Sequence, residues 1–543
     1  MLIIFPSGSY YCFNEKCGIF FWGAHSHDAI WHLAIAAVSF HSIPFTLPNF
    51  AGTVLSGYNY LLDLFIFILS IFHIPALFTY FKLLPIIWFL LFTTLTIIFA
   101  RKIRDTVWFV GSLLFFVYFG GSFSYILTLY HHGTIWNSAG LVAQQAGHTL
   151  INLQYAFSLI FLLGILILIK RKRIGLKESL LLSIFVAVNI GLKFYAGIIS
   201  LIIVALFYLF LFLSEKKLSS FFVRFIILAI FTIVSIFLFY NPFQSLKSGS
   251  VFSFSPLSIV HPFIEEPELF YLKDTTNARY FLQSKGIGPR LIGIELLTLT
   301  LFLIFNFGTR IFGLCYIAVY GLRKKLNQFD LIVGLTIIFS ILLTIFFVQK
   351  GEWWNTIQFL YYGIFLSNIF VALFLNDILK KRKLLNYILV FCIITLTIPI
   401  DFDLIKVFSS LSGPAYLPKQ ELQALDFLKN QPYGTVLTSP FDPTLTKHLK
   451  QPIPLFASND NSYIAAFSGK PLYVADEMQL RLTGTDFTKR LNETHIWECS
   501  YLDKINYIYD VKSTRQPKNF EQCQNKIRLI FNNSQVNIYL VMK

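Results

Sequence analysis

Long apolar runs alternate with short polar clusters through most of the chain. Between Ala76 and Ile400 these runs repeatedly reach about eighteen residues or more, the length that a helix needs to cross a bilayer. The pattern therefore predicts a polytopic α-helical membrane protein with about ten spans. The predicted spans are Ala76–Ala100, Thr106–Ser124, Asn152–Ile169, Glu178–Ile190, Gly197–Leu213, Phe221–Tyr240, Leu291–Leu322, Leu331–Val348, Ile357–Leu375 and Leu384–Ile400.

Three apolar segments depart from a simple crossing. Glu178–Ile190 is short and predicts a tilted or broken helix, because glycines and a lysine interrupt the sequence around its end. Leu291–Leu322 is long, and we expect the sequence NFGT at Asn306–Thr309 to bend it. Gly57–Phe72 is predicted to be a helix on the outer face of the membrane, because a further crossing here would break the agreement of the loop charges.

The loop charges orient the predicted bundle. Clusters such as RKIRD (Arg101–Asp105), KRKRIGLK (Lys170–Lys177) and KKRK (Lys380–Lys383) fall on one side under this set of spans. Lys and Arg accumulate in cytoplasmic loops, so this side is predicted to be cytoplasmic. The region of Asp28 and everything after Asp401 are then predicted to lie outside the cytoplasm, at the cell (plasma or inner) membrane.

Composition agrees with a membrane location and argues against nucleic-acid binding. Of the 543 residues, 56% are hydrophobic and 13% are charged, whereas soluble domains are about a quarter charged. The formal net charge of +16 resides in short loop clusters and not in a basic stripe interleaved with stacking aromatics. We therefore expect membrane lipids, and no nucleic acid, as partners.

The last part of the chain has a different pattern. Beyond Asp401, charges and prolines become more frequent and the periodicity shortens. Helices are predicted at Pro418–Asn430, in SNDNSYIAAFSG and in TDFTKRLNE, and strands at Thr435–Ser439, Lys470–Asp476, INYIYDV and the hairpin IRLIFNNSQVNIYLV. Alternating strands and helices predict a small α/β domain. The chain thus divides into an outer loop with an outer-face helix (1–75), a transmembrane bundle (76–400) and an extracytoplasmic α/β domain (401–543).

An ionisable cluster stands near the start of this apolar chain. The stretch FWGAHSHDAIWHLA holds His25, His27, Asp28 and His32. A carboxylate is a natural general base for an acceptor hydroxyl and also binds divalent cations, so Asp28 is the predicted catalytic residue. His27 and His32 are predicted to bind substrate, and His25, His27 and Asp28 form a candidate ligand set for a divalent metal ion. The alternative is a polar stretch with tryptophan anchors at the membrane interface.

Further candidates for substrate binding lie in other outer segments. Lys193 sits between two apolar runs, where an unpaired ammonium is costly unless an anion such as a lipid phosphate offsets it. Arg279 and Arg290 lie on the same predicted side, and Glu352 and Gln358 belong to a short loop, QKGEWWNTIQFLYYG, that runs into a span. The alternatives are snorkelling of the basic side chains and an aromatic belt.

The cysteines fit an oxidising outer compartment. Cys12 and Cys17 lie in the outer N-terminal segment, and Cys499 and Cys523 lie in the outer α/β region. Each pair is predicted to form a disulfide. A metal knuckle is the alternative for Cys12 and Cys17, although no second pair stands nearby in the sequence.

These motifs together resemble a known family. The stretch HSHDAIWHLA with Asp28, the run PFTLPNFAGTVLSGYNYLLD and the closing RLIFNNSQVNIYLV, placed around a multi-span bundle, are similar to bacterial membrane glycosyltransferases of the GT-C superfamily. This group includes aminoarabinose, mannosyl and oligosaccharyl transferases. The resemblance implies that Asp28 occupies the family's catalytic aspartate of the first outer loop. Two features depart from the family: its first transmembrane helix has no counterpart here, and no second acidic motif follows in the next outer loop.

The resemblance also implies a mechanism, that of an inverting glycosyltransferase of the cell envelope. A polyprenyl-phosphate carrier would donate the sugar, with its phosphate near Lys193, Arg279 or Arg290. Asp28 would act as base toward an acceptor glycan, lipid or protein, and the basic groups would stabilise the departing phosphate. Two other classes fit the spans: a polytopic transporter or flippase, which usually shows paired internal repeats, and a non-catalytic membrane protein of envelope assembly.

Overall fold

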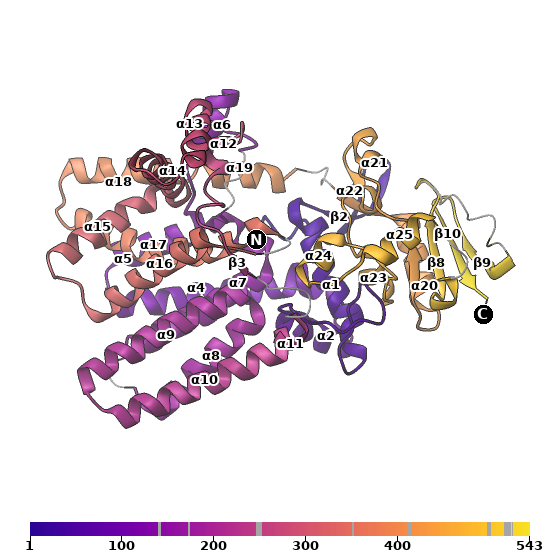
Figure 1. The fold of residues 1–543 in the computed structure, drawn as a ribbon, viewed down its shortest axis with the longest axis horizontal. Coiled ribbons are helices and arrows are strands. Elements are labelled where there is room, and N and C mark those ends of the chain that lie inside the picture. The colour runs from indigo at the N-terminus through magenta and orange to yellow at the C-terminus, as the bar shows by residue number, and fades with distance from the viewer. Residues whose placement is uncertain are drawn as a thin grey trace.

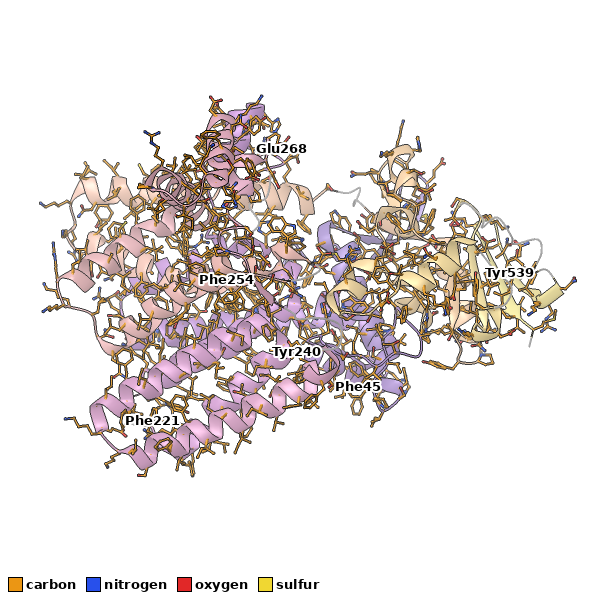
Figure 2. All side chains as sticks on the ribbon, viewed as in Figure 1. Phe45, Phe221, Tyr240, Phe254, Glu268 and Tyr539 are labelled. Carbon is orange, nitrogen blue, oxygen red and sulfur yellow. A yellow bond between two sulfur atoms is a disulfide. The ribbon has the colours of Figure 1, made fainter. Side chains whose placement is uncertain are left out.

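The structure, a computed structural model, describes residues 1–138, 143–171, 174–245, 252–349, 352–410, 415–496, 501–514, 523 and 525–542. A helical bundle occupies one end of the molecule and an α/β region the other, with the N-terminal segment between them (Figure 1). The predicted fold class, a polytopic helical protein with a C-terminal α/β region, is confirmed. Side chains fill the bundle, and Tyr240 lies at the end of it that faces the N-terminal segment (Figure 2).

Seven helices of the described residues, and not the predicted ten, are long and apolar enough to cross a membrane. They are Ala76–Ile103 (α3, Ala76–Phe78; a π-helical turn, Thr79–Leu83; α4, Leu84–Ile103), α9 (Phe194–Glu215), α10 (Leu218–Tyr240), Pro289–Leu322 (α14, Pro289–Phe307, and α15, Ile311–Leu322), α16 (Gln328–Phe346), Trp353–Leu379 (ending in α17, Gln358–Leu379) and Leu384–Phe408 (α18, Leu384–Thr397, and α19, Pro399–Phe408). An eighth is obtained if α5 (Val107–Phe119) and α6 (Ser124–His132), which meet at 51°, form one broken span.

The remaining predicted spans lie at the short end of the lengths that cross a bilayer. Both α7 (Leu153–Ile169) and α8 (Leu176–Leu192) have 17 residues, or about 26 Å at 1.5 Å per residue, against about 30 Å of hydrocarbon. The helix predicted at Thr106–Ser124 ends early, because the chain leaves the helical conformation at Gly120. The buried Arg310 guanidinium donates hydrogen bonds to the carbonyl oxygens of Gly120 and Gly121, which the helix end leaves without helical partners. Within the segment Leu291–Leu322, where a bend is predicted at NFGT, α14 ends at Phe307 and Gly308, at φ 55°, interrupts the regular helix.

One helix forms the centre of the bundle. The apolar window of the span that contains α17 is 94% buried, whereas that of α10 is 17% buried. Helices α5, α9, α15 and α16 pack around α17. On the side of α9, helices α8 and α10 pack next to it, so that α8, α9 and α10 lie side by side (Figure 1). The start of α17 is therefore held rigidly, which matters because it lines the site described below.

The C-terminal residues 415–542, here called the tail, contain most of the predicted α/β elements. Its larger sheet has the order β6 (Val436–Thr438), β8 (Tyr507–Val511), β10 (Val536–Val541) and β9 (Ile527–Asn532), with β6 and β8 parallel and the rest antiparallel. Helices α20 (Lys419–Lys429), α23 (Tyr463–Ser468) and α25 (Thr488–Ile496) match the predicted ones.

The prediction of a strand at Lys470–Asp476 is wrong. This segment makes a single bridge, Leu472 to Val436. Its other backbone hydrogen bonds go to a loop of the N-terminal segment: the Leu472 N–H donates to the Pro48 carbonyl, and the Ala475 N–H donates to the Asn49 carbonyl. The apolar alternation is real, but the partner is an irregular loop, so no ladder forms.

A second sheet joins the two ends of the chain. Its order is β1 (Ser9–Phe13), β2 (Lys16–Phe21), β5 (Ala415–Pro418) and β7 (Ile453–Pro454), so the N-terminal hairpin pairs with the tail. Cys12 and Cys17 lie opposite each other in the β1–β2 hairpin and form a disulfide. The predicted segments 1–75 and 401–543 are therefore in direct contact. Cys523 is buried and disulfide-bonded, and its predicted partner Cys499 lies outside the described residues.

The N-terminal segment also packs on the tail through its helices. Helix α1 (Asp28–Val38) lies against α23, and α2 (Leu61–Ile71) lies against α1. Helix α2 lies within the predicted outer-face helix and, at 11 residues, is too short to cross a bilayer. The remaining elements are α11 (Pro242–Ser245), α12 (Pro262–Glu265), α13 (Lys273–Ser284), α21 (Pro443–His448), α22 (Leu455–Ser458), α24 (Glu477–Leu482), β3 (Phe252–Phe254) and β4 (Phe347–Gln349).

Candidate functional site

A cavity of about 880 Å³ lies where the bundle, the N-terminal segment and the tail meet. Its walls come from α1, the turn before α2, the α8–α9 junction, the start of α17 and residues 478–486 of the tail. Four predicted site residues line it, namely Asp28, His32, Lys193 and Gln358. The volume is typical of sites for small-molecule ligands, so the fold brings these four residues from distant parts of the chain to one binding space.

Asp28 is the first residue of α1, where the helix dipole favours a negative charge. Its side chain is 39% exposed, toward the cavity. Burial would raise the pKa of Asp28, but the hydrogen bond and charge of His27, assisted by the charge of Lys193, hold this pKa below its ordinary value. Asp28 is therefore an ionised carboxylate at neutral pH.

His27 bridges Asp28 to the tail. Its Nδ1 lies 3.1 Å from Oδ1 of Asp28, and its Nε2 lies 3.2 Å from Oδ1 of Asp476. Because ionised carboxylates only accept hydrogen bonds, both ring nitrogens must donate and the ring is an imidazolium. Burial lowers the pKa of His27, but the hydrogen bonds and charges of Asp28 and Asp476 outweigh it and raise this pKa to about 11.

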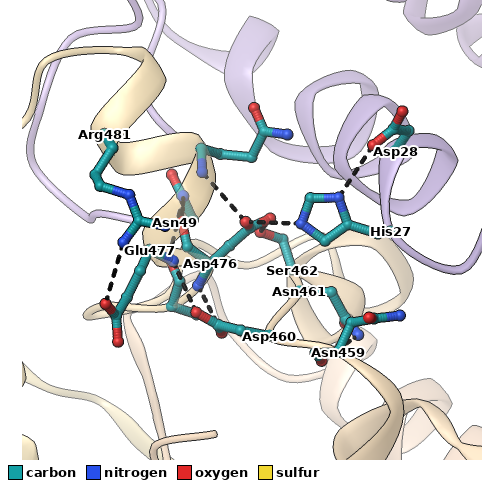
Figure 3. A network of polar contacts seen from close by, with 12 residues as sticks. His27, Asp28, Asn49, Asn459, Asp460, Asn461, Ser462, Asp476, Glu477 and Arg481 are labelled. Carbon is teal, nitrogen blue, oxygen red and sulfur yellow. Dashed lines mark hydrogen bonds and ion pairs between the residues drawn. The ribbon is translucent and has the colours of Figure 1, made fainter. Parts of the chain in front are cut away.

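The tail holds Asp476 in turn. Ser462 donates to Oδ2 of Asp476 at 3.1 Å, and the carboxylate of Asp460 accepts the backbone N–H groups of Asp476 and Glu477 at 2.9 and 2.7 Å. Figure 3 shows this network, with His27 between the two carboxylates and Asp460 beneath the turn that begins α24. The sequence predicts that His27 binds substrate. In the structure its two ring nitrogens instead link Asp28, at the start of α1, to Asp476 of the tail.

His32 follows Asp28 by one turn of α1, as the spacing predicted. Its Nδ1 lies 3.0 Å from Oδ2 and 3.1 Å from Oδ1 of Asp63, the third residue of α2. Gln154 donates to the same carboxylate at 3.0 Å. Asp63 is fully buried behind His32, which itself reaches the cavity.

Lys193 lies in the short break between α8 and α9, at the cavity wall. Burial lowers its pKa to about 8, against the opposing effect of the Asp28 charge. Within the described part of the chain, its ammonium makes no hydrogen bond or ion pair at contact distance. An ammonium that faces a cavity without a bound counter-ion is suited to an anionic ligand.

The loop before α17 supplies further polar groups to the lining of the cavity. Gln358 donates to Asn355, and Asn355 and Tyr195 both donate to Oε1 of Gln349 at 2.8 Å. Oε1 of Gln358 is buried without a partner among the described residues. Glu352 instead pairs with Arg481 at 3.2 Å and so positions a cation of the tail at the cavity.

Two predicted phosphate ligands lie elsewhere. Arg279 is 5% exposed and its guanidinium is already paired with Glu265 at 2.7 Å and with Glu295 at 3.0 Å. Arg290 is exposed at the start of α14, and α13 and α14 lie at the side of the bundle away from α1 and α24 (Figure 1). Neither residue lines the cavity. Their predicted role at the same site as Lys193 is therefore not supported by the geometry.

The three predicted metal ligands do not converge on one point. His25 is fully buried and turned away, with Nδ1 at 2.8 Å from Ser7 and Nε2 at 3.4 Å from the Leu150 carbonyl. Both nitrogens of His27 are occupied by carboxylates, so neither has a lone pair for a cation. Among the described residues no group of three His, Cys, Asp or Glu side chains is placed to hold a metal ion.

Sequence reasoning missed three residues of this region. Asp476, Arg481 and Asp63 are brought to the site by the tail and by α2. Asp63 lies in the run GYNYLLD, where a lone acid amid apolar residues was a usable signal. Nothing in the local sequence ties Asp476 to His27, since 449 positions separate them.

Comparisons with known proteins support the fold at low sequence identity. No family model and no curated protein sequence matches the chain. A crystal structure of the Archaeoglobus fulgidus oligosaccharyltransferase in complex with Zn and sulfate matches with a TM-score of 0.51 and 13% identity, over 94% of this chain and 66% of that one. A structure of oligosaccharyltransferase AglB from the same archaeon, with an inhibitory peptide and a dolichol-phosphate, matches with a TM-score of 0.49 and 12% identity, over 94% and 68%.

The chain thus spans just under two thirds of the first neighbour's length. Identity this low carries the architecture and not the chemistry. The likeness is therefore one of fold: the chain has an architecture similar to that of the Archaeoglobus fulgidus oligosaccharyltransferase.

Proposed function

We propose that the chain is a membrane glycosyltransferase that moves a sugar from a polyprenyl-phosphate carrier to an acceptor hydroxyl within the 880 Å³ cavity. One observation carries the proposal: an oriented carboxylate, Asp28, and an ammonium without a bound counter-ion, Lys193, line the same cavity in a GT-C-like fold. The first suits an acceptor hydroxyl and the second a phosphate.

The proposed donor binds with its phosphate at Lys193 and its lipid tail toward the apolar helices. Aromatic residues line this part of the cavity, among them Phe194, Tyr195, Tyr240 and Phe252. As the bond between the anomeric carbon and the phosphate oxygen breaks, negative charge grows on the phosphate, and the nearby ammonium stabilises it. Electrostatic stabilisation of this kind commonly contributes two to three orders of magnitude in rate, or about 2.7–4 kcal/mol.

The proposed acceptor enters from the tail side. Residues 478–486 form that wall, and Arg481, fixed by Glu352, supplies a second cation there. The carboxylate of Asp28 accepts the hydrogen bond of the attacking hydroxyl and aligns its oxygen with the anomeric carbon. Attack from the face opposite the phosphate inverts the configuration, and we propose the extracytoplasmic side of the cell membrane as the location.

The direct test is a transfer assay with the purified full chain in nanodiscs. Polyprenyl-phosphate sugars with a radiolabelled hexose or pentose are the donors, and an extract of host membranes supplies acceptors. We expect label to leave the lipid and to enter a product. Asp28→Asn should lower this rate by about 100-fold, because the neutral amide no longer aligns the hydroxyl with the anomeric carbon. Asp503→Asn, which neutralises a carboxylate that is 74% exposed and does not line the cavity, is the matched control. Equal rates for the wild type and Asp28→Asn would contradict the proposal.

A further inference from the structure

The cavity holds a second acid–base element behind Asp28. The carboxylate of Asp63 is completely buried, and its partners are Nδ1 of His32 at 3.0 Å and the amide of Gln154 at 3.0 Å. A buried carboxylate costs free energy unless it is well paired. Here it is paired with the imidazole of His32, a residue that lines the cavity.

This contact fixes the orientation of the imidazole. Since Asp63 only accepts hydrogen bonds when ionised, Nδ1 of His32 carries the proton, and the neutral ring then has its lone pair on Nε2. The rings of Tyr58 and Tyr80 lie beside that of His32, with centroids at 5.8 and 6.5 Å. The ring is thus held by its neighbours and cannot rotate freely.

The remaining nitrogen, Nε2, is available to a ligand in the cavity. His32 is a cavity residue although its side chain is 2% exposed, so only an edge of the ring reaches that space. Nε2 makes no hydrogen bond to any described residue, and it is not one of the buried polar atoms that lack a partner. A ring nitrogen that has no hydrogen bond within the protein and is not completely buried can accept a hydrogen bond from a ligand.

Asp28 is less suited to keep a proton. Its Oδ1 is engaged by the His27 imidazolium, and that cation, assisted by Lys193, holds the pKa of Asp28 below its ordinary value. A carboxylate in this state is a good hydrogen-bond acceptor but a weak base toward a hydroxyl, because proton transfer is favoured when the base binds the proton well.

We infer that His32, oriented by Asp63, takes the proton of the acceptor hydroxyl while Asp28 holds the same hydroxyl by a hydrogen bond. This inference rests on the proposed glycosyl transfer. The acceptor oxygen forms a bond to the anomeric carbon, and the bond from that carbon to the phosphate oxygen breaks, with its electron pair leaving on the polyprenyl phosphate. The hydroxyl proton moves to Nε2, and Asp63 stabilises the resulting imidazolium. The proton then passes to water in the cavity.

The test is chemical rescue in the same transfer assay. His32→Ala should lower the transfer rate by about 100- to 10,000-fold, the usual contribution of a general base. Because the missing ring leaves a space beside the cavity, added imidazole should restore part of the rate in a saturable way. Rescue by substituted imidazoles should rise with their basicity. His41→Ala, which removes an exposed histidine that bonds only the Ala37 carbonyl, is the matched control and should behave as the wild type.

Two further variants separate chemistry from folding. His32→Asn can still donate to Asp63 but lacks Nε2, so it should fold and remain inactive even if His32→Ala does not fold. Asp63→Asn offers an N–H to Nδ1 and favours the wrong tautomer, a change that lowers turnover by up to about 10,000-fold in comparable dyads. Its turnover should fall while the donor KM and the thermal midpoint stay close to the wild type.

Each outcome decides the inference. Activity in His32→Asn, or a folded His32→Ala that is inactive and not rescued, would assign His32 a structural role and overturn the inference. Activity that falls only in step with the thermal midpoint in Asp63→Asn would do the same. In these cases wild-type transfer, and the proposed function, would stand. Absence of transfer by the wild-type protein would remove the proposed function and this inference together.

Discussion

Replacing Asp476 by Asn tests how the tail holds the N-terminal segment at His27 and Asp28. The Asp476 side chain is fully buried and the His27 side chain is 15% exposed, with 3.2 Å between Nε2 and Oδ1. Removing one partner of a buried ion pair costs about 3–5 kcal/mol. Because the amide oxygen still accepts a hydrogen bond and Asp28 still neutralises the imidazolium, we expect the lower value, about 3 kcal/mol.

The effect should depend on pH in a definite direction. The pKa of His27 is raised from 6.5 to about 11 in the folded protein, by Asp28 and Asp476 against the effect of burial. A raised histidine pKa stabilises the fold fully below the unfolded value and loses this contribution as the pH rises through the folded value. The difference between wild type and Asp476→Asn should therefore be largest near pH 6 and shrink progressively above it.

Pulse proteolysis in urea, on the full chain in detergent, measures the free energy of unfolding of the tail. The matched control is Glu477→Gln, which neutralises the next residue. Its partner Arg481 lies 3.6 Å away and both side chains are about 40% exposed, so the expected loss is below about 1 kcal/mol. A double-mutant cycle with His27→Gln isolates the pair. Equal losses for Asp476→Asn and Glu477→Gln, or a loss that does not change with pH, would show that the His27–Asp476 ion pair does not stabilise the tail.

Three other predictions concern the cavity lysine, a buried carboxyl group of the tail and the membrane topology. Lys193→Met should raise the donor KM by about 10- to 100-fold in the transfer assay, since a charged hydrogen bond contributes about 1.5–3 kcal/mol, and an unchanged KM would contradict a phosphate at Lys193. Burial raises the pKa of Glu421 from 4.5 to about 7, against hydrogen bonds from two tyrosines, so stability falls as the pH rises through this range. Glu421→Gln should therefore stabilise the tail by about 3 kcal/mol near pH 8 and hardly at pH 4, and pulse proteolysis that finds the same gain at both would be evidence against it. A single cysteine placed at Thr485 should react with a membrane-impermeant maleimide in intact cells, whereas one placed at Gly175 should not, and the reverse labelling would invert the predicted topology.

Local periodicity was sufficient for much of the fold. Helix α20 and strands β6, β8, β9 and β10 could be predicted because the signals that make them, amphipathic spacing and turn residues, lie within each segment. The number of spans was overestimated because hydropathy records how apolar a run is and not where its helix stops. Helix α5 ends before Gly120, whose carbonyl oxygen accepts a hydrogen bond from Arg310, almost 200 positions later in the sequence.

The site was predictable only in part. The sequence indicates three site residues, because they are polar residues in apolar surroundings: Asp28, Lys193 and Gln358. The fold brings all three to one cavity. Arg279 gave the same signal, but its charge is met by Glu265 and Glu295, 14 and 16 positions away. A cation among apolar residues therefore points to a ligand only when no nearby carboxylate can reach it, and the sequence does not say which carboxylates can.

The pairing of β2 with β5 constrains the order of biosynthesis. Roughly 400 residues separate Phe21 from its partner Ala415, and at about 5–20 residues per second their translation takes about 20–80 s. Throughout that time the hairpin that leads into Asp28 has an unpaired strand edge, which invites pairing with other chains. His27 also waits for Asp476 to emerge. A stalled or shortened nascent chain can therefore insert its helices without forming the β2–β5 pairing or the His27–Asp476 contact. Its open strand edge gives the cell's quality control a feature by which to recognise it.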